Sequence, residues 1–158
     1  MRPKYLLLLF SLLTILVTGY IFSNSMKNSE ESHAQSNAVM EVVEPVLTPV
    51  IRQDTEEATE KKLSFVVRKA AHFIEFAALG ICVGGFAVSL SALKKRSLWG
   101  LGPVICLAVA GCDEFIQSFF DRTSSIKDVA LDMCGSIAGL LLVAVVVFLW
   151  KRRKELKT

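Results

Sequence analysis

Hydrophobic positions along the chain gather in four long runs that are separated by short polar segments. The runs cover residues 5–22, 70–93, 97–120 and 129–150. A transmembrane helix needs roughly 20 apolar residues, because each residue adds about 1.5 Å along the helix axis. The pattern therefore predicts an all-α integral membrane protein. We expect a bundle of four transmembrane helices with an extracytoplasmic segment between helices one and two.

The runs divide the chain into four parts. They are a first transmembrane helix at 1–22, an extracytoplasmic loop at 23–63, a three-helix core at 64–150 and a basic cytoplasmic tail at 151–158. The first run also has the basic flank and apolar centre of a signal peptide, but its small-residue cleavage signal is poor. We favour an uncleaved helix that could act as a signal anchor. With 158 residues, of which 53% are hydrophobic, the chain fits one small membrane domain.

The loop between the first two runs has an apolar centre. Valine and leucine residues of 39–51 recur near helical spacing, and Pro45 and Pro49 would kink a continuous helix there. We expect short amphipathic pieces that lie on the outer membrane surface, with a disordered loop as the alternative. The next segment, "TEEATEKK" (55–62), is polar and compatible with a helix.

Basic residues next to the runs predict the orientation in the membrane. They precede the first run, separate the second from the third, and follow the fourth: Arg2, Lys4, Lys94, Lys95, Arg96, Lys151, Arg152, Arg153, Lys154 and Lys157. Short basic segments stay in the cytoplasm. We therefore expect a multi-pass cell-membrane protein with both termini cytoplasmic. The net charge of +3 follows from this topology, so nucleic-acid binding is not indicated.

With this topology, the unusual polar residues in and next to the runs share one depth on the extracytoplasmic side. They are Arg68, Lys69, His72, Glu75, Asp113, Glu114, Gln117, Asp121, Arg122, Lys127, Asp128 and Asp132. Within each run they recur at helical spacing, so each set is predicted to share one face of its helix. An ionisable residue at the centre of a transmembrane helix costs about 2.5–3.5 kcal/mol. These groups must pair, protonate, bind a cation or line a wet pocket.

A purely structural role would be to hold the helices together by ion pairs. Buried ion pairs contribute little net stability, because the loss of hydration offsets their attraction. So many ionisable groups inside a membrane instead favour a functional site.

Small residues indicate how the helices pack. Gly80 and Gly84 form a G-x-x-x-G pattern, as do Gly135 and Gly139, and such spacing lets helices approach closely. The second pair continues the stripe of Asp132, so this stripe should face the bundle interior. The four cysteines all lie within the runs and lack the spacing of zinc ligands, so we interpret them as packing residues.

Two segments together resemble a known family. They are "RKAAHFIEFAALG" (68–80) and "DEFIQSFFDRTSSIKDVALDMCGSIAG" (113–139), and the resemblance covers residues 64–142. Their pattern is similar to that of the VanZ-like family. The resemblance implies a small multi-pass bacterial membrane protein. The member that gives the family its name is associated with reduced susceptibility to teicoplanin, a glycopeptide that carries a fatty chain. The resemblance names no reaction for this chain.

Three mechanisms remain open at this point. A membrane enzyme acting on a cell-envelope or lipid-linked ligand would use as catalytic candidates His72, Glu75, Asp113, Glu114 and Asp132. Its ligand-binding candidates are Arg68, Lys69, Gln117, Arg122 and Asp128. A non-catalytic module for a lipid head group, a glycopeptide or a partner protein needs the same placement without chemistry. A transporter is disfavoured, because the inner halves of the runs are apolar. The glycine patterns permit a homodimer, and the sequence identifies no metal or other cofactor.

Overall fold

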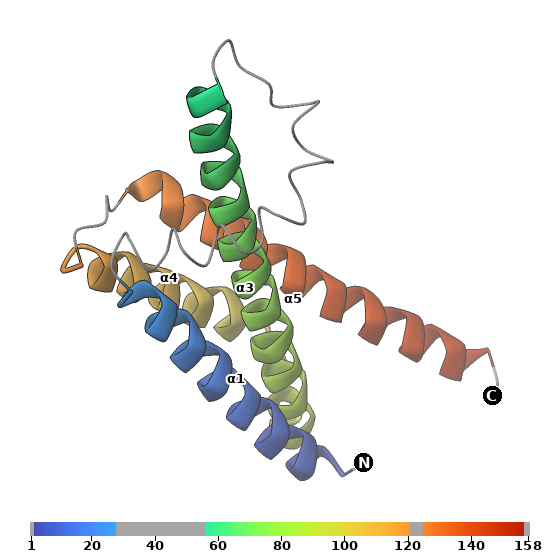
Figure 1. Ribbon diagram of the computed structural model, residues 1–158. Coiled ribbons are helices and arrows are strands. Elements are labelled where there is room, and N and C mark those ends of the chain that lie inside the picture. Colours follow the sequence, from blue (N-terminus) through green and yellow to red (C-terminus); the bar gives the residue numbers. More distant parts are fainter. Residues whose placement is uncertain (1, 28–55, 121–124, 157–158) are drawn as a thin grey trace.

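The computed structural model describes residues 2–27, 56–120 and 125–156, and within these ranges it is all-helical. The helices are α1 (Pro3–Ser25), α3 (Glu56–Lys94), α4 (Leu101–Gln117) and α5 (Ile126–Glu155), as Figure 1 shows. The described residues contain no strand, which confirms the predicted all-α class. The amphipathic pieces expected at 39–51, and the candidate residue Arg122, lie outside the described residues.

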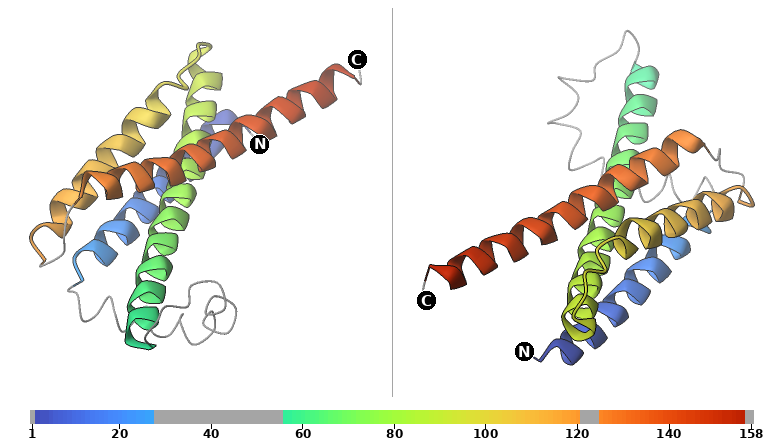
Figure 2. Two further views of the ribbon diagram at one scale, coloured as in Figure 1. Left: turned by 90° about the horizontal axis from the view of Figure 1, so that it is seen from above. Right: turned by 180° about the vertical axis from the view of Figure 1, so that it is seen from behind.

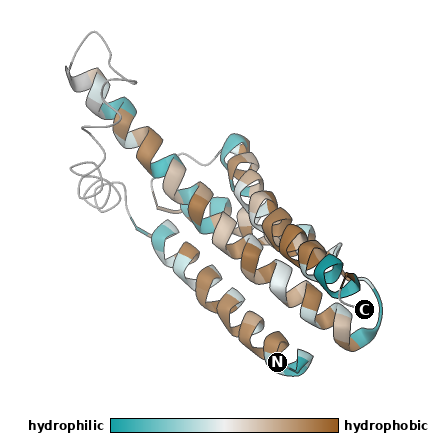
Figure 3. Ribbon diagram, turned by 90° about the vertical axis from the view of Figure 1, so that its right-hand side faces the viewer, coloured by the Kyte–Doolittle hydropathy of each residue, from teal (hydrophilic) through white to brown (hydrophobic). Residues whose placement is uncertain are grey.

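Three of the four helices are long and apolar enough to cross a membrane. They are Pro3–Ser25, Lys61–Lys94 and Ile126–Glu155. Figure 3 shows the apolar residues as brown bands along the helices, with hydrophilic residues in teal at helix ends and also part-way along the longest helix. Helix α4 has 17 residues and is the shortest of the described helices. The helical membrane class is therefore supported, and the count of four membrane crossings stays a prediction.

Helix α3 is much longer than the apolar run that predicted it. It has 39 residues, which corresponds to about 58 Å, whereas a bilayer core is about 30 Å thick. It begins at Glu56, in the polar segment that was judged compatible with a helix, and that expectation is confirmed. Hydropathy alone predicts a start at residue 70. It does not detect the polar helical turns that precede the apolar run.

Local signals explain where α1 and α5 begin and where α3 ends. Pro3 opens α1, where its missing N–H and its fixed φ cost nothing. Ser125 caps α5, because its Oγ accepts a hydrogen bond from the backbone N–H of Lys127 at 3.2 Å. Lys95, directly after α3, has a φ of 52°, a left-handed conformation that is common where a helix stops.

Helix α3 lies at the centre and contacts each of the other three helices. Consecutive helices run in opposite directions, so the end of α1, the end of α4 and the start of α5 lie at the same end of the bundle (Figures 1 and 2). The polar stretches that the sequence analysis placed at one depth lie at these ends. The fold thus brings them within reach of one another.

The crossing of α3 and α5 depends on glycines. A Cβ atom added at Gly135 would collide with the backbone of Phe73, and one added at Gly139 would collide with the backbone of Ala77. Gly80 of α3 is packed in the same way against the backbone of α5. The prediction that these glycines permit close helix approach is confirmed. Because both patterns are used within one chain, they give no support to the homodimer, which stays a prediction.

The apolar core fills the space where α1, α4 and α5 meet α3. It comprises Ile21, Phe76, Leu79, Val83, Cys106, Ala110 and Leu140. Many large apolar side chains of α1 and α5 instead point outward, for example Leu8 and Ile15 on α1 and Leu141 and Phe148 on α5. An apolar outer surface around a partly polar interior is the arrangement expected for helices that face lipid.

Candidate functional site

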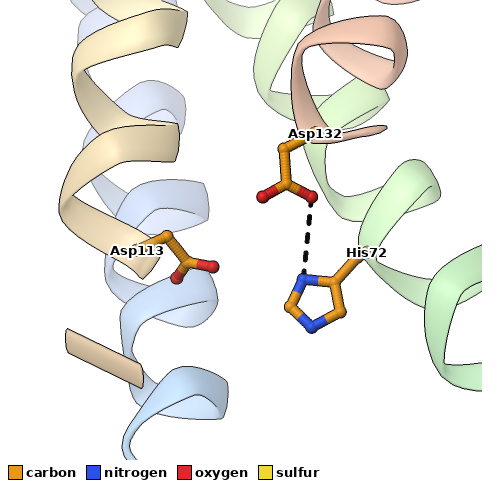
Figure 4. A group of neighbouring side chains, drawn as sticks. All are labelled: His72, Asp113 and Asp132. Atoms are coloured by element: carbon orange, nitrogen blue, oxygen red, sulfur yellow. Dashed lines mark ion pairs between the residues drawn. The ribbon is translucent and has the colours of Figure 1, made fainter. Parts of the chain in front are cut away.

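Three side chains from three helices converge near the end of the bundle where α4 ends and α5 begins. They are His72 of α3, Asp113 of α4 and Asp132 of α5, shown in Figure 4. His72 Nδ1 lies 3.9 Å from Asp132 Oδ1. One ligand atom from each of the three residues lies within 4.8 Å of the other two. The structure therefore brings together three of the five catalytic candidates, and we call His72, Asp113 and Asp132 the inner cluster.

Asp113 is held in place by two hydrogen bonds. Ser25 Oγ at the end of α1 donates to Asp113 Oδ1, and Gln117 Nε2, one turn further along α4, donates to Asp113 Oδ2 at 2.7 Å. Asp113, Ser25 and Gln117 are all buried. The sequence predicted the Asp113–Gln117 spacing, but it gave no sign that α1 would supply a donor.

Asp132 has no comparable pair of hydrogen-bond donors among the described residues. It is 1% exposed, and its Oδ2 atom has no hydrogen-bond partner among the described residues. The same is true of the Oγ atom of Ser136, one helical turn away on α5. Unpaired buried polar atoms are rare, and each one calls for an explanation. In Figure 4 the Asp132 oxygen that is not directed at His72 points towards the side of Asp113.

A second layer of polar residues lies closer to the start of α5. Lys69 of α3 forms an ion pair with Asp128 of α5, one turn before His72 and Asp132 respectively. Arg68 is half-buried on α3 and has no ion pair with a described residue. The Lys69–Asp128 pair therefore joins α3 to α5 one turn away from the inner cluster.

Glu75 faces a different helix from His72. Asn24 Nδ2 of α1 donates a hydrogen bond of 2.8 Å to Glu75 Oε1, and Lys27 Nζ donates one of 2.8 Å to Asn24 Oδ1. The prediction that His72 and Glu75 share a helix face is correct for the backbone, yet their side chains contact different neighbours. Asn24 and Lys27 were missed, because an isolated polar residue after an apolar run is common.

Glu114 anchors the connection between α4 and α5. Its Oε2 accepts a hydrogen bond of 2.9 Å from the backbone N–H of Ser125, which also caps α5. Glu114 is 5% exposed, and the hydrogen bond is partly buried. This contact gives Glu114 a clear role in positioning α5, whereas it lies outside the inner cluster.

A groove between α1 and α3 opens beside these polar residues. It has a volume of about 530 Å³ and is lined by Leu16, Val17, Tyr20, Ala71, Ile74, Glu75 and Ala78. Ligand pockets commonly measure about 300–1,000 Å³. Six of the lining residues have apolar or aromatic side chains, and Glu75 supplies the one ionisable group. The groove is thus complementary to an amphiphilic molecule, because its walls are mostly apolar and Glu75 adds a polar group.

Comparison with known proteins supports the family suggested by the two segments. A family model described as VanZ/LLP1 matches residues 10–149. The chain belongs to the VanZ/LLP1 family. No curated protein and no solved structure gives a significant match. The suspected VanZ-like membership is therefore confirmed.

The VanZ/LLP1 match reaches well beyond residues 64–142, where the sequence resemblance was noticed. It starts within α1 and ends near the end of the apolar part of α5. All four described helices therefore belong to the family region, including the α1 residues Asn24 and Ser25 that contact Glu75 and Asp113.

The charges of this VanZ/LLP1 site do not balance among the described residues. Five carboxylates occur there: Glu75, Asp113, Glu114, Asp128 and Asp132. Four permanent cations lie among or beside them: Lys27, Arg68, Lys69 and Lys127. The imbalance is greatest in the inner cluster, which has two buried carboxylates and one imidazole. Such a site suits a cation, or a ligand that brings one, better than a bare anion.

Proposed function

We propose that this VanZ/LLP1-family protein binds a lipid or lipid-linked ligand of the cell envelope. The hydrocarbon chain of the ligand would lie in the α1–α3 groove and its polar head would reach the residues around His72 and Glu75. The observation that carries the proposal is the position of Glu75, which lines the apolar groove and is hydrogen-bonded to Asn24 beside the polar cluster.

The walls of the groove favour a hydrocarbon chain over a soluble ligand. Leu16 and Tyr20 of α1 and Ile74 of α3 line it and are also strongly exposed. On helices that cross a membrane, exposed side chains of this kind face lipid. A chain from the surrounding bilayer would therefore enter the groove sideways, without leaving an apolar environment.

The proposal includes an orientation. We infer that α1, α3, α4 and α5 all cross the membrane, with both termini in the cytoplasm and the polar site on the extracytoplasmic side. The basic residues at 94–96 and 151–154 support this orientation by the positive-inside rule. The ligand would then come from the outer leaflet.

Lipid that remains bound after purification tests the proposal. The full chain would be purified in mild detergent and its bound lipids identified by native mass spectrometry. Ala71→Trp would fill the groove, whereas Ala70→Trp adds the same side chain at the neighbouring exposed position, which does not line it. We expect a retained envelope lipid in wild type and Ala70→Trp, and its loss in Ala71→Trp. Equal lipid content in all three proteins would contradict the groove assignment.

A glycopeptide with a fatty chain is a second candidate for the same groove. Teicoplanin combines an apolar chain with a large polar body, which is the combination that the groove and the polar residues around it would accept. Expression in a susceptible bacterial host, followed by measurement of growth in teicoplanin and in a glycopeptide without a fatty chain, separates the two cases. Protection against teicoplanin alone, lost in Ala71→Trp, would support this ligand.

The same placement serves an enzyme and a non-catalytic module. The inner cluster offers an imidazole and two carboxylates, which are groups that acid–base or metal-assisted hydrolysis uses. A module that holds a head group or a partner protein would need the charges of these side chains, but it would tolerate a change in side-chain length. A conservative substitution at Asp132 distinguishes these two mechanisms, as argued in the Discussion.

A further inference from the structure

We infer that His72, Asp113 and Asp132 form a binding site for one divalent transition-metal cation, such as zinc or manganese. An imidazole nitrogen and two carboxylate oxygens from three different helices make up the site. Imidazole suits zinc and iron, and carboxylates suit manganese and magnesium, so a mixed set favours a borderline divalent ion. The inference concerns the inner cluster alone and does not depend on the lipid ligand.

The spacing of the three residues is close to what a metal requires. A tetrahedral metal with bonds of about 2.1 Å holds its ligand atoms about 3.4 Å apart. His72 Nδ1 and Asp132 Oδ1 lie 3.9 Å apart, and the whole set lies within 4.8 Å. A bound ion would draw these atoms closer together by about 1 Å.

The unpartnered oxygen of Asp132 is the second, independent observation. Asp132 is almost completely buried, and its Oδ2 atom has no hydrogen-bond partner among the described residues. In Figure 4 this atom points towards the side of Asp113, so two buried carboxylates face one another. Without a cation between them, both burial and mutual repulsion oppose their charges. A divalent ion would satisfy the free oxygen and offset the repulsion.

The surroundings of Asp113 resemble those of a metal ligand. Ser25 and Gln117 each donate a hydrogen bond to one of its oxygens, which fixes the orientation of the carboxylate while leaving lone pairs available. Lys69 is the lysine of α3 closest in sequence to His72, and it forms an ion pair with Asp128. Three protein ligands would leave at least one coordination position open for water or for a ligand oxygen.

Metal analysis of the full chain tests the inference. Wild type, Asp132→Asn and Glu155→Gln would be purified in nanodiscs, stripped with a chelator and reloaded with zinc or manganese. Glu155→Gln is the control, because it converts a carboxylate to an amide at the exposed far end of the same helix. We expect a single ion per chain in wild type and Glu155→Gln, and its loss in Asp132→Asn. Gln117→Leu, which removes a support of Asp113, should weaken binding by about 10–100-fold.

A second readout keeps the test decisive if a variant folds poorly. Cobalt added to the stripped wild-type protein should give visible absorption bands that zinc displaces. Metal should also raise the unfolding temperature of wild type and Glu155→Gln, since an ion that binds the folded state stabilises it. No metal in wild type after loading with either ion, or unchanged stoichiometry in Asp132→Asn, would overturn the inference. Lipid measured in the same samples reports separately on the proposed function.

Discussion

Gly135 of α5 lies directly against the backbone of Phe73 of α3, with no room for a side chain between them. His72 is the residue before Phe73, and Asp132 lies one turn before Gly135, so the two acid–base groups flank this contact. The 3.9 Å separation between His72 and Asp132 therefore depends on how closely the two helix backbones approach. The packing of α3 against α5 therefore sets the geometry of the site.

Gly135→Ala should damage both stability and the site. The new methyl group would collide with the Phe73 backbone, and overpacking of this kind typically costs about 1–3 kcal/mol. Gly111→Ala is the control, because nothing lies near a Cβ there, and a helical alanine is favoured over glycine by up to about 1 kcal/mol. Thermal unfolding in detergent should show a lower midpoint for Gly135→Ala and an equal or higher one for Gly111→Ala. Equal midpoints for both variants would mean that the crossing is loosely packed.

Ser25→Ala should loosen α1 from α4. It removes the donor to the buried Asp113 oxygen, and a buried acceptor left without its donor typically costs about 1–3 kcal/mol. Ser23→Ala, two residues earlier at an exposed position, should have almost no effect. Protease sensitivity and thermal unfolding of the two variants provide the comparison. A Ser25→Ala protein as stable as Ser23→Ala would show that the hydrogen bond contributes little.

Asp132→Glu and Asp132→Ala should separate catalysis from binding. Both variants should insert normally, and loss of the carboxylate in Asp132→Ala should abolish the proposed protection against teicoplanin. A catalytic carboxylate displaced by one methylene group should lose about 10²-fold in rate, whereas a binding site should tolerate the retained charge. Teicoplanin susceptibility of a host that expresses each variant, with protein level checked by immunoblot, is the measurement. A normal phenotype in Asp132→Ala would indicate that the cluster is scaffolding.

Labelling of single cysteines should reveal the predicted orientation. In a chain whose four native cysteines are replaced by alanine, Lys62→Cys and Lys95→Cys place one thiol near each end of α3. We expect a membrane-impermeant maleimide to label Lys62→Cys in intact cells and Lys95→Cys after permeabilisation alone. Labelling of both positions from outside would rule out a membrane crossing by α3.

The sequence predicted the class of fold and the general position of the site, because these depend on local patterns. Apolar runs indicated the helices, and the G-x-x-x-G spacing of Gly135 and Gly139 indicated the close crossing. Helical spacing placed Asp113 and Gln117 on one face, and the structure shows them hydrogen-bonded.

The details that the sequence did not predict depend on how the helices are rotated and paired. His72 and Glu75 are close on the helix surface, but one faces α5 and the other accepts a hydrogen bond from Asn24 of α1. The partner of each side chain follows from the position of α1, which no periodicity encodes. The contribution of Ser25 was missed for the same reason, because its serine-rich surroundings gave it no individual signal.

The shortness of α4 has a consequence for the membrane itself. Its 17 residues measure about 25 Å, a few ångströms less than the hydrocarbon thickness of a typical bilayer. Local thinning of the bilayer is one way to accommodate a crossing by α4, and it would draw water and lipid head groups towards the ends of the helix. Asp113 and Glu114 lie in the last turn and a half of this helix, so they would need to sink less deeply into hydrocarbon. The protein would thus reshape the surrounding lipid in a way that makes its own buried charges easier to accommodate.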